Sequence, residues 1–189
     1  MQALKNKILN NRYRKTTNGF WLFVVVLILS FQLQAQSSRE YNIKAVFLYN
    51  FTQFVDWPPS AFSNAESPFI IGILGEDPFH AALDEAVVGE KVKDHPIIVQ
   101  RYHDVKDITT CHILFINLKE ESKMKETLSI LSGKNILTVS DMPDFAAIGG
   151  IVRFASEKNK IRLQINLPAS KHADLTISSK LLQVADIVR

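Results

Sequence analysis

The sequence has 189 residues, with 22 Lys and Arg against 19 Asp and Glu, and a formal net charge of +3. Five of the basic residues and none of the acidic ones precede position 36, so residues 36–189 carry 17 basic against 19 acidic residues, a net charge of −2. This balance excludes nucleic-acid binding driven by a basic surface, and about 154 residues (189 − 35) suffice for one domain with its own core.

Residues 1–35 have the pattern of a signal peptide. A basic patch at residues 12–15 is followed by an apolar run over residues 20–31, and Ala35 offers a small residue at a cleavage point. The run has roughly 12 residues, whereas a membrane-spanning helix needs about 20. We therefore predict that residues 1–35 are a signal peptide cleaved near Ala35, which exports residues 36–189. An uncleaved membrane anchor and a buried core helix are the alternatives.

The first element expected in the exported part is a helix over Ser38–Val55. Glu40 suits its first turn, and the Pro-rich sequence that begins at Trp57 ends it. One apolar stripe consists of Ile43, Phe47, Phe51 and Phe54, and a second of Ala45, Leu48, Thr52 and Val55. Because so little of this helix is polar, we expect it to be buried on most sides or to lie in an interface.

Alternating strands and helices are expected next. A buried strand at Phe69–Leu74 leads to a helix with Asp77 as its N-cap and Pro78 as its first residue, which ends at Gly89. The further elements are strands at Ile97–Val99, Ile113–Ile116 and Ile136–Val139, a turn or short helix near Asp104, a helix at Glu120–Leu131, alternating strands at Ile151–Ala155 and Ile161–Leu167, and a last helix at Ser178–Val188. This order predicts a single three-layer α/β/α domain with a largely parallel sheet and a C-terminal antiparallel hairpin at its edge.

The residues that usually carry chemistry are scattered. The five histidines (His80, His95, His103, His112 and His172) have no metal-ligand spacing, so we expect no metal and no cofactor. The one cysteine, Cys111, lies in an apolar run, which favours a small buried side chain over a nucleophile. No nucleophile elbow and no triad partners are present, and the pattern predicts a protein that is not an enzyme.

Two features near position 145 allow a ligand site. Asp141 and Asp144 follow a predicted strand, at the sheet edge where open α/β sheets bind ligands, although a turn followed by a helix cap is the favoured explanation of the two acids. The pair Gly149 and Gly150 indicates positive φ or close backbone approach.

Several blocks of sequence, kept in order along the chain, carry a resemblance to a known family. They are Lys44–Pro58, Ile71–Phe79, Cys111–Ile116, Leu137–Ala146, Gly149–Val152 with Phe154, Ile161–Leu167 and Ile177–Leu182. In these blocks the chain resembles the YfiR-like family of bacterial periplasmic proteins.

The resemblance implies a periplasmic α/β protein without known catalysis, often a homodimer. It also implies that the protein binds the periplasmic part of a membrane-bound diguanylate cyclase and represses it, which holds cyclic-di-GMP and biofilm formation down. Some relatives sense redox state through paired cysteines, which Cys111 alone cannot do within one chain. A periplasmic small-ligand sensor for a histidine kinase or another receptor is the alternative function.

Two sets of residues are the candidate sites. The candidate partner interface consists of aromatic residues of the first helix and its exit: Tyr41, Phe47, Phe51, Phe54 and Trp57. For most of them core packing is the alternative. The candidate ligand pocket consists of Asp141, Asp144, Phe145, Gly149, Gly150, Arg153 and Arg162. For the two arginines, a pairing with acids across the hairpin is the alternative.

Overall fold

The computed structural model describes residues 38–157 and 160–188. The chain divides into two compact units, Met1–Glu40 and Tyr41–Arg189. Of the first unit only residues 38–40 are described, and they are helical. The predicted signal peptide lies outside the described residues. In the second unit, residues 41–54 form the first helix.

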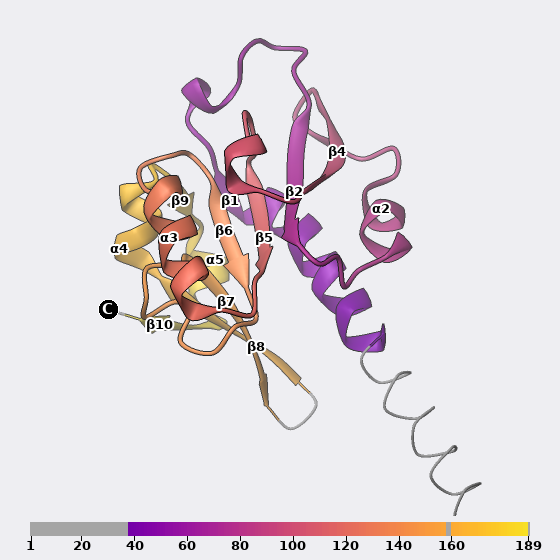
Figure 1. Cartoon of the computed structure of the whole chain (residues 1–189). Helices are drawn as coiled ribbons and strands as arrows, with labels where there is room; N and C mark the ends of the chain where they lie inside the picture. Colours follow the sequence, from indigo (N-terminus) through magenta and orange to yellow (C-terminus); the bar gives the residue numbers. More distant parts are fainter. Residues whose placement is uncertain (1–37, 158–159, 189) are drawn as a thin grey trace, which may run out of the picture. The chain divides into compact units, whose positions relative to one another are not determined.

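An eight-stranded sheet forms the centre of the second unit, in the order β10-β8-β7-β6-β5-β2-β4-β3 (Figure 1). The strands are β2 (Phe69–Gly75), β3 (Lys91–Val92), β4 (His95–Tyr102), β5 (Ile113–Asn117), β6 (Leu137–Ser140), β7 (Val152–Glu157), β8 (Lys160–Asn166) and β10 (Ala185–Val188). All neighbours run parallel except β3–β4 and β7–β8. The largely parallel sheet and the β7–β8 hairpin confirm the predicted α/β fold class.

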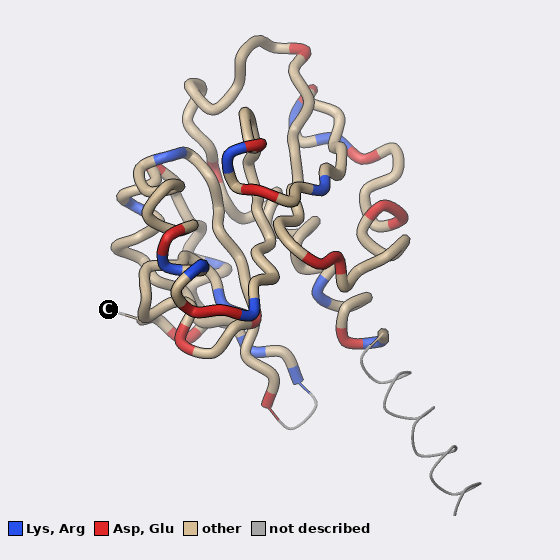
Figure 2. The backbone as a smooth tube through the Cα atoms, in the orientation of Figure 1, with Lys and Arg blue, Asp and Glu red and all other residues tan. Residues whose placement is uncertain are grey.

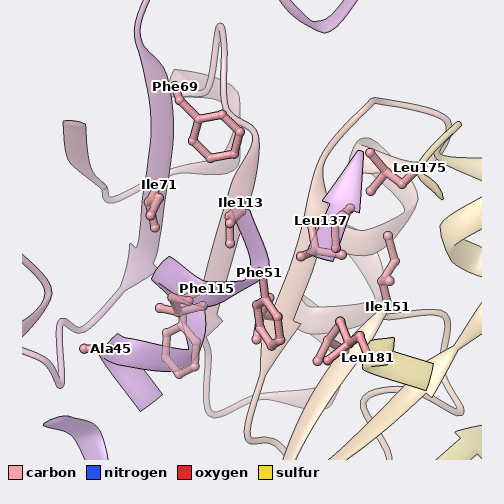
Figure 3. Packing of buried hydrophobic residues seen from close by; sticks show 14 of the residues in the cluster. Ala45, Phe51, Phe69, Ile71, Ile113, Phe115, Leu137, Ile151, Leu175 and Leu181 are labelled. Atoms are coloured by element: carbon pink, nitrogen blue, oxygen red, sulfur yellow. The ribbon is translucent and has the colours of Figure 1, made fainter. Parts of the chain in front are cut away.

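Helices cover both faces of the sheet. On one face, residues 41–54, α2 (Ala81–Val87) and α5 (Ser179–Leu182) contribute to one buried cluster, together with the two-stranded sheet of β1 (Val55–Asp56) and β9 (Thr176–Ile177). On the other face, α3 (Glu121–Leu131) contributes Met124, Leu128 and Leu131 to a second cluster. Figure 3 shows Ala45 and Phe51 of the first helix among side chains of the central strands.

The side of the first helix that faces the core takes residues from both predicted stripes. Ala45 and Leu48 of the second stripe and Phe51 of the first are fully buried, whereas Ile43, also of the first stripe, remains 46% exposed. The helix ends at residue 54 because Val55 and Asp56 pair antiparallel with Ile177 and Thr176 of β9. The expectation of a helix that is buried on most sides therefore holds for only one of its faces.

The start of α2 differs from the prediction. The Asp77 carboxylate accepts hydrogen bonds from the backbone N–H groups of Phe79 (2.7 Å) and His80 (3.3 Å), and the helix begins only at Ala81. Asp77 therefore closes a turn instead of capping the helix, and this turn carries the Phe79 ring into the core.

The C-terminal segment also differs. The predicted helix over Ser178–Val188 stops at Leu182, with Ser178 as its N-cap, and residues Ala185–Val188 form β10. β10 pairs parallel with β8, so the hairpin lies one strand in from the edge. The unpaired backbone groups of β8 provide a reason for this, because a strand can satisfy them and a helix cannot. A further helix, α4 (Leu167–His172), was not predicted from the sequence, and Asn166 caps it through Ala169 N–H.

Candidate functional site

The exposed side of the first helix carries apolar side chains. Ile43 is 46% and Val46 is 49% exposed, and the half-buried Phe47 lies next to them. The Phe47 ring packs 5.9 Å from Phe154 and 6.5 Å from Phe51, so the core fixes its position while one side of it remains accessible. We call Ile43, Val46 and Phe47 the outer helix face. Rigid, half-exposed apolar groups of this kind are typical of partner-binding surfaces.

The predicted interface residues divide between this helix and the core. Phe51 is fully buried and stacks on Phe154 at 6.0 Å, and Trp57 is buried with its Nε1–H donating to the His112 carbonyl oxygen at 3.1 Å. Phe47 and Phe54 are half-buried. Phe51 and Trp57 thus have packing contacts in this structure. The exposed Ile43 and Val46 were not among the predicted interface residues, because helical periodicity alone does not reveal how the helix is rotated about its axis against the sheet.

A partly buried ionic network ties the first helix to the carboxyl end of β6. The Lys44 ammonium, 2% exposed, lies 2.8 Å from Asp141 Oδ2, and the Tyr41 hydroxyl donates to the same oxygen at 2.9 Å. The Lys44 ammonium also lies 4.3 Å from the centre of the Tyr41 ring. Asp141, predicted as a pocket residue, therefore accepts hydrogen bonds from two side chains of the protein itself, almost 100 positions earlier in the chain.

The other predicted pocket residues form a closed turn. The Phe145 ring is fully buried and lies so close to Gly150 that a Cβ atom there would overlap it. Gly150 N–H donates to the Phe145 carbonyl at 2.9 Å, and Asp144 and Gly149 have φ values of +60° and +109°. The close approach expected of the glycine pair is present at Gly150, but its partner is the turn's own aromatic ring.

The two predicted arginines are diagonal neighbours in the β7–β8 hairpin, and they differ in burial and contacts. Arg153 is half-buried, and it donates from Nε to the Met142 carbonyl at 3.0 Å and from a terminal nitrogen to Gln164 Oε1 at 2.9 Å. Arg162 is exposed and lies opposite Ala155 in the hairpin. Arg153 thus supports the turn after β6, through a carbonyl and an amide and not through the acids that were the predicted alternative.

The amino ends of the strands hold a cluster that was not predicted from the sequence. The His112 ring packs against both Phe62 (4.7 Å) and Phe69 (4.5 Å), and the Phe62 ring also stacks on His95 (4.1 Å). His112 Nδ1 accepts from Ile70 N–H at 3.0 Å, which leaves Nε2 to donate to the Ala61 carbonyl at 3.1 Å. The stack and these hydrogen bonds fasten the 59–62 segment to the sheet.

Burial lowers the pKa of His112 to about 4, although its hydrogen bond to Ala61 acts in the opposite direction. The imidazole is therefore neutral around pH 7, in the tautomer that its two backbone contacts require. Neither ring nitrogen of His112 is available to a ligand. Among residues 38–157 and 160–188, no three His, Cys, Asp or Glu side chains gather as a metal site.

Cys111 precedes His112 in the chain, and its side chain is buried in the cluster on the other face of the sheet. Its thiol donates to the Ile113 carbonyl at 3.0 Å, and burial raises its pKa to about 12. A thiol with so little thiolate is a poor nucleophile, and its burial keeps it from the thiol of another chain.

A comparison with protein families identifies the family of this chain. Residues 41–186 match the YfiR/HmsC-like family, and the chain belongs to that family. Its members are regulatory proteins and not known enzymes. No curated protein matches the chain. None of the helices in the described ranges has the length and the apolar character that crossing a membrane requires.

Proposed function

We propose that this protein is an exported periplasmic regulator that binds the periplasmic part of a membrane-bound diguanylate cyclase and represses it. Family membership carries the proposal. In this proposal residues 1–35 are removed near Ala35, and residues 36–189 act by binding, as a homodimer, without catalysis or a cofactor.

The way in which the carboxyl ends of the strands are filled supports a protein partner over a small ligand. Open α/β sheets usually bind ligands at this edge. Here Tyr41 and Lys44 take up the Asp141 carboxylate, and the Phe145 ring closes the turn over Gly150. These contacts favour the regulator over the alternative, a small-ligand sensor for a histidine kinase.

The outer helix face is the surface that we propose for the partner. Burying the exposed parts of Ile43 and Val46 would contribute on the order of 1 kcal/mol each, since complete burial of such side chains is worth about 1.5–3 kcal/mol. The Phe47 ring, held by Phe51 and Phe154, needs no ordering on binding.

Lys and Arg lie among Asp and Glu over the described residues, so these residues carry no basic surface of the kind that binds nucleic acids (Figure 2).

Repression across a membrane is a shift between two states of the cyclase. A protein that binds only the inactive state of the receptor in the periplasm raises the population of that state, and the cytoplasmic part then makes less cyclic-di-GMP. Converting a receptor from 99% active to 99% inactive takes about 5.5 kcal/mol of differential binding. The exposed parts of Ile43 and Val46 would supply only about 2 kcal/mol of this difference, so further contacts with the receptor must supply the rest.

Deleting the gene and measuring cyclic-di-GMP tests the proposal. We expect the concentration to rise, and to return when the gene is supplied again. Unchanged cyclic-di-GMP would refute the repression of a cyclase. Export is tested separately by sequencing the amino terminus of the protein from the periplasmic fraction: a start near Gln36 is expected, and an intact Met1 would contradict cleavage.

A further inference from the structure

The two edges of the eight-stranded sheet are unequally protected. β3 is only two residues long, contains the exposed Lys91, and is followed at once by Lys93. Short length and lysines are what keep natural sheet edges from pairing with other chains. β10 has four residues, Ala185–Val188, with one charged side chain, the exposed Asp186, and without a lysine or a proline. No strand of the described residues pairs with its outer side.

The core also stops abruptly at β10. A row of side chains on one face of the sheet runs from Val139 through Val152 and Ile165 to Ile187, because these residues are paired neighbours in the sheet. The first three are fully buried, whereas Ile187 is 40% exposed. The row would be complete if another strand continued the sheet beyond β10.

We propose that β10 pairs antiparallel with β10 of a second copy of this chain, so that two sheets join into one. The inference rests on the homodimer included in the proposed function, and it names the surface. A two-fold axis perpendicular to the sheet lets the same edge serve both copies and keeps the same face of both sheets together.

Charge selects the register of this pairing. Residues directly opposite each other in an antiparallel pair lie on the same face of the sheet, so the two-fold axis must pass between one residue and its own symmetry mate. If three of the four residues of β10 are to pair, this residue is either Asp186 or Ile187. An Asp186 pair would place like charges directly opposite each other, which destabilises a sheet. The Ile187 register pairs the two exposed isoleucines, places Asp186 opposite Val188 of the second copy, and continues the apolar row across the joint.

Disulfide trapping of the purified protein tests this register. In it, the two copies of Ile187 have Cα atoms about 4.5–5.5 Å apart, within the range that a disulfide spans. The variant Ile187→Cys should therefore form a covalent dimer on mild oxidation. The matched variant Ala185→Cys should not, because a four-residue offset separates its two copies by about 14 Å. Wild type is the control, since its one cysteine is buried.

Light scattering of the purified protein tests the surface itself. We expect a dimer for wild type and for Ile130→Lys, which adds the same charge on α3, and a dimer at least 10-fold weaker for Ile187→Lys with a normal melting temperature. Loss of dimer in Ile187→Lys and trapping of Ile187→Cys support the proposal. A dimer that survives Ile187→Lys, or trapping of Ala185→Cys, would overturn this edge while leaving the homodimer intact. A monomeric wild type would overturn both, whereas repression is judged independently by cyclic-di-GMP.

Discussion

At the amino ends of the parallel strands, aromatic side chains and a neutral histidine pack together. At the carboxyl ends, charged side chains form ion pairs. Phe62, His112 and Phe69 stack on one another around the starts of β2 and β5. At the opposite ends, Lys44 pairs with Asp141 after β6, and Arg101 of β4 pairs with Asp77 and Asp84. The first arrangement depends on a histidine that stays neutral, and the second on charges that stay matched.

This difference shows why the sheet edge that usually binds ligands offers little here. The carboxyl ends hold polar side chains, but these are engaged with one another. Apolar surface is exposed instead on the outer helix face, at Ile43 and Val46. The outer helix face is thus better suited to contact a partner than the carboxyl ends of the strands are. The difference between the two ends of the strands can be tested by substitutions at each.

The largest effect is expected from breaking the buried ion pair. Asp141→Ala removes a carboxylate that lies 2.8 Å from an ammonium that is only 2% exposed. Because Asp141 itself is 23% exposed, the free energy of unfolding should fall by on the order of 3 kcal/mol, the low end of the range for buried pairs. Urea denaturation at pH 7 measures it. The double variant Lys44→Met with Asp141→Leu, which removes both charges, should lose less. A change below about 0.5 kcal/mol in Asp141→Ala would show that the pair does not hold the helix.

Acid should lower the free energy of unfolding through His112, at the amino ends of the strands. The pKa of His112 is about 4 in the folded chain and about 6.5 in an unfolded one, so the unfolded chain binds more protons between these values. Above pH 6.5 the ionisation of His112 does not change the free energy of unfolding. As the pH falls from 6.5 to 4, the free energy of unfolding decreases by up to about 3 kcal/mol in total.

Denaturation at pH 7 and pH 5 checks this expectation for His112. Wild type should lose roughly 2 kcal/mol between the two, from about 1.36 kcal/mol per pH unit below 6.5. His112→Gln should lose much less, while His103→Gln, which replaces an exposed histidine, should behave as wild type. The same loss in His112→Gln as in wild type would assign the acid sensitivity to other groups.

A smaller effect is expected from the exposed ion pairs of the carboxyl ends. Hydrogen bonds to Asp84 and Asp77 raise the pKa of Arg101, but its side chain is 41% exposed, so solvent screens these pairs. Arg101→Gln should lower the free energy of unfolding by about 0.5–1 kcal/mol, and 1 M NaCl should remove most of the difference. A loss as large as that of Asp141→Ala would mean that burial does not govern the strength of these pairs.

The smallest effect is expected at Cys111. With a pKa of about 12 and a buried thiol, it should not react with a maleimide in the native protein at pH 7 over hours, and should react fully in urea. Mass spectrometry reads both results. Rapid labelling of the folded protein would show that this end of the sheet opens readily.

The parallel core was predictable because its strands are continuous apolar runs, as at Phe69–Leu74. The last strand was not, because Ser178–Val188 has a pattern compatible with a helix and becomes a strand only through pairing with β8. Likewise Asp77 suits an N-cap as well as a turn, and the burial of Phe79 selects the turn. Local sequence thus indicated the buried strands, and long-range contacts determined the rest.

The candidate site was predictable only in part. The apolar first helix and Asp141 were both selected from the sequence, but their contact spans 97 positions between Lys44 and Asp141. The rotation of the helix that exposes Ile43 and Val46 depends on packing against Phe154, which helical periodicity does not reveal. His112 could not be distinguished from a surface histidine, because its ring stacks on Phe62 and Phe69, which come from another part of the chain.

Repression through the outer helix face is tested most directly by the cyclic-di-GMP concentration in cells that lack the gene and carry a Val46→Lys copy. Val46 is half-exposed on the outer helix face, so the lysine should leave the fold intact and block the partner. We expect cyclic-di-GMP to stay as high as in the deletion strain, while wild type and Ile130→Lys, on the opposite face of the sheet, restore the low level. Full restoration by Val46→Lys, with equal amounts of folded protein, would contradict repression through this face.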